Sequence, residues 1–285
     1  MFNRLFGKKS GDRIPHQAPG SVCRLIAAYL DCPCEVIPEG TEYGEVVRLF
    51  HASVAEGKAR GFVPVLIAAN EENLAESLYD NAGLADIPEG DVSDGNDFAL
   101  DEARLRTLRD YRAHLIAAWQ KDDAEKYLQT RIAECAEDGE FDLEEEWGGD
   151  EIFFEFVRDG ITAPFNDDTQ KSYELLLAKI PVSEPWQVAA WLPMGGWNEC
   201  PAPEDMLAMV KRWYERYGAV ICSVTFAELE FRVSNPPADM DDAYALAKEQ
   251  YYFCQDRVEQ YANEYSLKTL ADNLTKSPYW YFWWD

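Results

Sequence analysis

The sequence predicts an α+β protein in which a mixed β-sheet is flanked by helices. Three observations favour this class. Residues 43–69 combine an amphipathic helical stripe with a short β-branched apolar run, residues 219–233 contain two adjoining strand-like runs, and the final stretch, SPYWYFWWD, carries six consecutive aromatic residues. Segments of helical period therefore alternate with strand-like segments, which is typical of a sheet covered by helices.

The N-terminal part begins this alternation. Apolar residues recur at helical spacing over 43–54, and Gly61 ends that predicted helix. The run FVPVLIAA (62–69) is short, apolar and rich in β-branched residues, so it predicts a buried strand. Asn70 suits the N-cap of a following helix, which Gly83 ends.

The middle of the chain is predicted to be mainly helical. Residues 86–96 are rich in Gly, Pro, Asp and Ser and predict a loop. Apolar spacing over 108–132 indicates a long helix continued by a second one. The stretch IFFEFV (152–157) predicts a strand, and residues 172–178 a short helix.

The last third alternates again. A helix is predicted from Pro203 to Tyr217 and ends at Gly218, and paired strands follow over 219–233. NPPADMDDA then opens a helix that reaches about Cys254, and a final short helix covers 267–274.

The aromatic tail is predicted to be a strand. Tyr279, Tyr281 and Trp283 would share one face, whereas Trp280, Phe282 and Trp284 would share the other. A strand that is apolar on both faces suits the interior of a sheet with helices on each side. We therefore expect this strand to be buried in the core, because exposed rings would promote aggregation.

Charge and cysteine content limit the classes of function. Asp and Glu outnumber Lys and Arg by 53 to 26, giving a net charge of −27 and a pI near 4.4. This charge would repel a phosphate backbone, so no nucleic-acid partner is expected. Seven cysteines without a regular framework or a secretory pattern predict a reducing cytoplasm, and no apolar run is long enough for a membrane span.

Composition divides the chain into four regions. We expect a flexible N-terminus over 1–19, an α/β part over 20–96, a helical acidic middle region over 97–182 that resembles an insertion, and an α+β domain over 183–285.

The middle region contains the most acidic segment. Eleven acidic residues and no Lys or Arg lie between Glu134 and Glu155. An EF-hand loop begun at Asp138 would need Gly where Leu143 stands and Glu where Gly149 stands, so calcium is disfavoured. A solvated connector and a patch for a basic partner stay open, and the patch would comprise Asp142, Glu144, Glu145, Glu146, Asp150 and Glu151.

The ordered motifs GGWNECPAP, KRWYERYGA, ELEFRVSNPP, AYALAKEQYYFC and SPYWYFWWD resemble the bacterial family catalogued as domain of unknown function 4253. The resemblance is strongest over 183–285, and GFVPVLI near residue 61 is similar to the upstream strand of the family. It implies an architecture and a bacterial source but brings no assigned activity.

The WNEC stretch contains the candidate site residues, although no catalytic set is found. Cys200 precedes a helix whose N-terminus could activate a thiol, but a nucleophile needs a base, and a buried packing cysteine is the alternative. Trp197, Asn198 and Glu199 could hold a polar ligand or a partner loop, or could simply fix their own turn. Cys32 and Cys34 form C-x-C and complete no zinc motif, so no metal or cofactor is predicted.

These observations favour a non-catalytic, cytoplasmic protein-binding module whose acidic face meets a basic protein, as an immunity or antitoxin-type protein would. The alternative is a small-molecule-binding protein or enzyme with a pocket near the GGWNEC turn.

Overall fold

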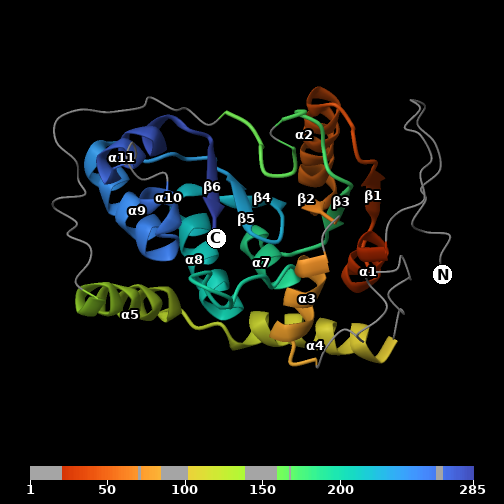
Figure 1. Ribbon diagram of the computed structural model, residues 1–285, viewed down its shortest axis with the longest axis horizontal. Helices are drawn as coiled ribbons and strands as arrows, with labels where there is room; N and C mark the ends of the chain where they lie inside the picture. The colour runs from red at the N-terminus through yellow and green to blue at the C-terminus, as the bar shows by residue number, and fades with distance from the viewer. Residues whose placement is uncertain (1–20, 70–71, 85–101, 139–158, 167, 261–265) are drawn as a thin grey trace.

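A computed structural model describes residues 21–69, 72–84, 102–138, 159–166, 168–260 and 266–285 (Figure 1). The predicted loop at 86–96, the predicted strand at 152–157 and the six acidic residues from Asp142 to Glu151 lie outside the described residues.

One six-stranded mixed sheet runs through the molecule, in the order β1-β3-β2-β4-β5-β6. The β2–β4 pair is parallel, and the other neighbouring strands are antiparallel. The mixed sheet of the predicted α+β class is thereby confirmed. The strands are β1 (Cys34–Ile37), β2 (Val63–Ala68), β3 (Leu175–Ile180), β4 (Val220–Val224), β5 (Glu228–Arg232) and β6 (Tyr279–Trp283).

Helices cover the two faces of the sheet unequally. On one face α2 (Tyr43–Arg60) packs against β2 and β3 over the smaller of two apolar clusters. The other helices contribute to a larger cluster on the opposite face, and Figure 1 shows α4 and α5 running beneath them. They are α1 (Ser21–Leu30), α3 (Glu72–Asn81), α4 (Glu102–Ala118), α5 (Asp123–Asp138), α7 (Val188–Trp191), α8 (Pro203–Tyr217), α9 (Met240–Phe253), α10 (Asp256–Glu259) and α11 (Leu267–Lys276), with a 3₁₀ turn η2 (Pro185–Gln187) before α7.

Local signals set the ends of several helices. The Asp239 side chain accepts a hydrogen bond from the backbone N–H of Asp242 at the start of α9, and Ser266 caps α11 through Thr269 in the same way. Pro203 occupies the first turn of α8, and Gly218, with φ of 59°, ends it in the left-handed conformation.

The helix predicted over 172–178 is wrong, because this stretch enters β3. Leu176 and Ala178 belong to the larger apolar cluster, whereas Leu175 and Leu177 belong to the smaller one. A strand that is buried on both faces has a continuous apolar run, here LLLA (175–178), in which the two-residue period is invisible. Its pairing with β1 and β2 on either side decides the conformation.

The aromatic tail forms β6 and is buried in the core, as predicted, but at an edge of the sheet. Trp280 and Phe282 are fully buried and Trp284 is 1% exposed. Phe282 stacks on Trp213 of α8, with ring centroids 5.4 Å apart. On the opposite face Tyr281 and Trp283 stay partly exposed. The expected interior position in the sheet is wrong, because β6 is the last strand in the sheet order and pairs with β5. Its burial comes from the helices of the larger cluster, which cover one face.

Candidate functional site

β2, β4 and β6 all end on the same side of the sheet, and we call the side where these carboxyl ends lie the carboxyl edge. β2 and β4 are parallel, and β6 has the direction of β4 because both are antiparallel to β5. In open sheets, ligands commonly bind just outside the carboxyl ends of parallel strands. This edge is therefore the natural place to look for a site.

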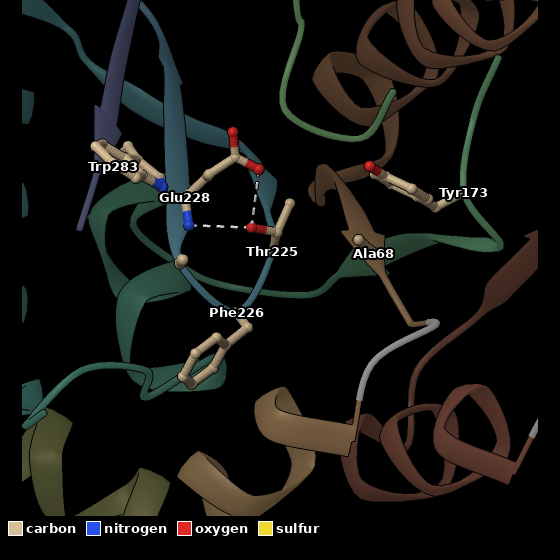
Figure 2. Close-up of a pocket in the computed structure, with 7 residues that line it drawn as sticks. Ala68, Tyr173, Thr225, Phe226, Glu228 and Trp283 are labelled. Carbon is tan, nitrogen blue, oxygen red and sulfur yellow. Dashed lines mark hydrogen bonds between the residues drawn. The ribbon is translucent and has the colours of Figure 1, made fainter. Parts of the chain in front are cut away.

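A pocket of about 140 Å³ opens at this edge, and we call it the carboxyl-edge notch. Figure 2 shows Tyr173 and Trp283 on opposite sides of the turn between β4 and β5, with Phe226 pointing away below it. In this view Tyr173 and Trp283 thus flank the turn that carries Thr225. The notch is lined by Ala68, Tyr173, Thr225, Phe226, Glu228 and Trp283.

Hydrogen bonds hold the Glu228 carboxylate in place. One oxygen accepts from the Thr225 hydroxyl at 3.1 Å, and the other accepts from the phenol of Tyr281 at 2.6 Å. The backbone N–H of Glu228 donates in turn to the Thr225 hydroxyl at 3.0 Å, as the dashed lines of Figure 2 show. The carboxylate is therefore held in a fixed orientation.

The predicted WNEC segment lies next to the notch. The Trp197 ring stacks on Phe226, with centroids 4.6 Å apart and an interplanar angle of 15°. Asn81 of α3 holds the preceding turn, because its side-chain amide donates to the main-chain oxygens of Pro193 at 2.9 Å and Gly195 at 3.0 Å. Gly195 has φ of 96°, and a Cβ there would lie 2.1 Å from the Pro201 oxygen, so this turn requires glycine.

Asn198 and Glu199 connect this turn to other elements. Asn198 adopts φ of 44°, and its side-chain amide donates to the main-chain oxygen of Asp285 at 2.7 Å. Glu199 forms an ion pair with Arg131 of α5 at 2.8 Å. Both side chains thus link this turn to other parts of the chain, Asn198 to the residue at the end of the aromatic tail and Glu199 to α5, whereas the sequence had offered a hydrogen bond within the turn itself.

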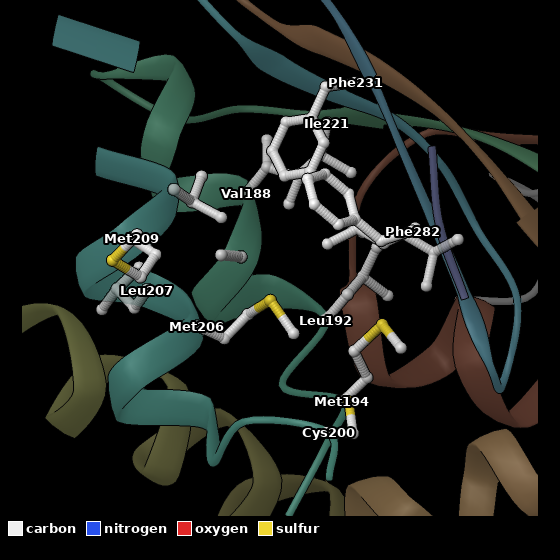
Figure 3. Close-up of a cluster of buried hydrophobic side chains, with 14 of the residues drawn as sticks. Val188, Leu192, Met194, Cys200, Met206, Leu207, Met209, Ile221, Phe231 and Phe282 are labelled. Atoms are coloured by element: carbon white, nitrogen blue, oxygen red, sulfur yellow. The ribbon is translucent and has the colours of Figure 1, made fainter. Parts of the chain in front are cut away.

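Cys200 points into the larger apolar cluster and not into the notch. It is 4% exposed and belongs to the buried side chains drawn in Figure 3. Burial, reinforced by nearby Cys254, raises the pKa of the Cys200 thiol well above its usual range. Burial also raises the pKa of Cys254, to about 12, and the Cys254 thiol donates to the main-chain oxygen of Trp283 at 3.0 Å.

Among the residues that the structure describes, no group of three or more His, Cys, Asp or Glu side chains is arranged to hold a metal ion. Within the same residues, no helix combines the length and apolar character needed to cross a membrane.

Sequence reasoning did not identify the notch. Its residues come from β2, from the segment before β3, from the turn between β4 and β5 together with the first residue of β5, and from β6. One local signal was present: Thr225 and Glu228 are three residues apart between two strand-like runs, a spacing that suits a side-chain-capped turn.

Comparison with known proteins agrees with the sequence motifs. Residues 176–285 match the family described as Domain of unknown function (DUF4253), which confirms the resemblance for the C-terminal part of the chain. The matched region begins within β3, so it contains Glu228 and Trp283 of the notch but not Ala68 or Tyr173. No curated protein and no solved structure gives a significant match.

Proposed function

Because the matched family supplies no activity, we propose from charge and geometry that the protein is a non-catalytic binding module for a basic protein. The observation that carries this proposal is the excess of 53 acidic over 26 basic residues. Such a charge steers a basic partner toward the surface and accelerates association. The specific form of the proposal is an immunity or antitoxin-type protein, with residues 142–151 as the acidic patch.

The surroundings of the thiols support a non-catalytic role. A thiolate is the nucleophilic form of cysteine, and the raised pKa of Cys200 keeps it protonated at neutral pH. His51 lies on α2, on the opposite face of the sheet, where its Nε2 atom is 3.3 Å from the Tyr279 hydroxyl. His114 is exposed on α4, whereas Cys200 is buried. Neither His51 nor His114 therefore lies where it could act as the base that a Cys200 nucleophile requires.

The alternative, a small-molecule-binding protein or enzyme with a pocket near the GGWNEC turn, has weaker support. The notch beside this turn measures about 140 Å³, whereas ligand pockets commonly measure about 300 to 1,000 Å³. Cys200 belongs to the apolar core and does not line the notch. A small polar notch suits a single side chain of a protein partner better than a whole metabolite.

We place the module in the bacterial cytoplasm. All seven cysteines are free, and four of them are buried in the folded protein. Free thiols persist in a reducing compartment. We also propose that nucleic acid is not a partner, because the net charge of −27 opposes a phosphate backbone.

Affinity purification from the source cell at two salt concentrations tests this function. We expect a basic protein to be retained at 50 mM salt and released at 500 mM, because screening weakens attraction between exposed charges. Replacing Glu144, Glu145 and Glu146 by Gln should weaken binding at least about threefold, since exposed ion pairs contribute about 0.2 to 1 kcal/mol each.

The matched control replaces three exposed glutamates of α3, α4 and α5, namely Glu76, Glu102 and Glu125, by Gln. This control should leave affinity within about twofold of the wild type, because it neutralises the same number of charges elsewhere. Recovery of no basic protein at low salt, or equal effects of the two triple variants, would reject the proposed acidic patch.

A further inference from the structure

We propose that Cys32 and Cys34, with Arg112 beside them, form a reversible redox site at which a small organic disulfide oxidises the two thiols to one intramolecular disulfide bond. The site lies where α1 leads into β1, the strand at one end of the sheet (Figure 1). Disulfides in cytosolic proteins are usually transient and serve redox sensing or catalysis. The inference does not depend on the proposed protein partner.

The backbone holds the two thiols close together. Pro33 alone separates them, and its main-chain oxygen accepts a hydrogen bond from the backbone N–H of Lys179 at 2.9 Å. The Cys34 thiol donates to the main-chain oxygen of Cys32 at 3.5 Å and also forms a hydrogen bond with the Cys32 thiol. Both cysteines are partly exposed, so a small disulfide can reach them.

The hydrogen bond between the thiols gives the two cysteines different roles. This bond, together with burial, raises the pKa of the Cys34 thiol well above its usual range. Cys34 therefore stays protonated near neutral pH. Because the thiolate is the attacking form in disulfide exchange, Cys32 is the member of the pair that attacks first.

Arg112 of α4 can stabilise negative charge on the Cys32 sulfur. Its guanidinium lies 3.7 Å from the ring centre of Trp191 and 5.6 Å from that of Tyr29, which holds it in place. Burial lowers the pKa of Arg112, whereas negative charge on Tyr29 or Cys32 raises it, so Cys32 is within electrostatic reach. The buried Nη1 atom of Arg112 has no hydrogen-bond partner in the described part of the chain. A cation in this position favours the anionic sulfur that exchange requires.

The exchange takes place in two balanced steps. The Cys32 thiolate attacks one sulfur of the disulfide R–S–S–R, whose S–S bond breaks, and RS⁻ leaves a mixed disulfide on Cys32. Cys34 then gives up its proton to solvent, attacks the Cys32 sulfur and expels the second RS⁻. The two protein thiols are oxidised, and the small disulfide is reduced to two thiols that take up the protons. A ring closed across one intervening residue is strained, and strained disulfides are readily reduced again.

Oxidation of the full chain by glutathione disulfide at pH 7 tests the inference. Remaining thiols are blocked after an acid quench, and mass spectrometry follows the tryptic peptide 25–48, which contains Cys32 and Cys34 and no other cysteine. We expect this peptide to lose two hydrogen atoms and to regain them in excess glutathione. The buried Cys23 lies in another peptide and should stay reduced.

Cysteine variants separate the two steps. Cys34→Ser should stop at the mixed disulfide, with one glutathione on peptide 25–48. Cys32→Ser should react at least about tenfold more slowly, because Cys34 is protonated. Cys135→Ser is the matched control, since Cys135 is also a partly exposed cysteine, and it should be oxidised within about twofold of the wild-type rate.

Arginine variants test the role of the cation. A folded Arg112→Met protein should form the mixed disulfide at least about fivefold more slowly, whereas Arg112→Lys, which keeps the charge, should stay within about twofold of the wild type. Arg106→Met removes an exposed arginine from the same helix and should also stay within about twofold. Circular dichroism establishes that each variant is folded.

Four results would each overturn the inference: a mixed disulfide that persists in the wild type, a disulfide that involves Cys23, a Cys32→Ser protein that takes up glutathione at the wild-type rate, or an unchanged rate in folded Arg112→Met. If Arg112→Met fails to fold, the comparison of Cys32→Ser with Cys34→Ser still decides which thiol attacks and whether the pair closes.

Discussion

Asn198 and Cys200 are two residues apart, yet the structure places their side chains in opposite surroundings. The Asn198 side chain is exposed and bonds to the main chain of Asp285, whereas Cys200 is buried in the apolar cluster. Their common turn therefore joins the surface to the core. A residue that resembles a nucleophile in the sequence acts here as a small apolar side chain.

The reactivity of the thiols tests this conclusion at the residue scale. With iodoacetamide at pH 8, we expect Cys200 in the native protein to react at least tenfold more slowly than the partly exposed Cys32. Unfolding in urea should equalise the two rates, and peptide mass spectrometry gives both. Preferential alkylation of native Cys200 would instead indicate an activated thiol and favour an enzyme.

The same surroundings link stability to alkaline pH. The pKa of Cys254 rises from 9.0 to about 12 on folding, so its contribution is complete below pH 9 and is lost as the pH rises toward 12. For this thiol alone, the free energy of unfolding should fall by about 1.4 kcal/mol per pH unit in that window. Urea unfolding at pH 8 to 11 measures the slope, and Cys254→Ala should reduce it by about this amount, while the buried Cys200 thiol, whose pKa is also raised, contributes equally in both proteins.

At the scale of secondary-structure elements, a buried carboxylate joins α8 to α9. Glu249 accepts hydrogen bonds from Arg212 at 2.8 Å, from Arg216 at 2.7 Å and from the indole of Trp213 at 3.1 Å. The indole N–H of Trp213 thus donates to the same carboxylate as the two arginines. This hydrogen bond and the surrounding apolar contacts together fix the position of Trp213. Phe282 of β6 then stacks on this fixed ring.

Neighbouring residues of β6 allow a matched comparison of its two faces. Phe282→Ala removes a fully buried ring and should lower the free energy of unfolding by about 3 to 5 kcal/mol. Trp283→Ala removes a larger ring that is partly exposed, and should lower it by about 1 kcal/mol. Urea unfolding curves with unchanged m-values give both numbers. An equal or greater loss for Trp283 would contradict the burial of one face.

At the scale of the whole molecule, strands from distant parts of the sequence share one sheet. β3 lies between β1 and β2, although more than 100 residues separate β2 (Val63–Ala68) from β3 (Leu175–Ile180). β2 in turn connects β3 to β4. The predicted division into four regions stays a prediction, but the strands 34–37 and 63–68 belong to the same sheet as the family-matched region.

This topology predicts the behaviour of the isolated family-matched region. A fragment of residues 176–285 keeps the β4–β5 and β5–β6 pairings and loses the three that involve β1 or β2. We expect it to lack a cooperative thermal transition in calorimetry, because β3 would have no partner strand and one side of β4 would be uncovered. The full chain is the control. A sharp transition in the fragment would show that the region folds independently.

The sequence by itself determined the fold class, most of the helices, the strands of the C-terminal third and the family of that part. Periodicity and helix-ending residues are local signals, and they work where one face of an element is buried, as in α8 (Pro203–Tyr217). They failed for β3, where burial on both faces removes the period.

Only the tertiary structure decided which strands are neighbours, that β6 lies at an edge, and that Ala68, Tyr173, Glu228 and Trp283 meet in one notch. Strand order arises from contacts between residues far apart in the chain. A local hydrophobic pattern indicates that a strand is buried, but it does not indicate which strand is its neighbour. A site assembled from separate segments therefore has no complete signature in any one of them, and the spacing of Thr225 and Glu228 indicates a capped turn but not the notch.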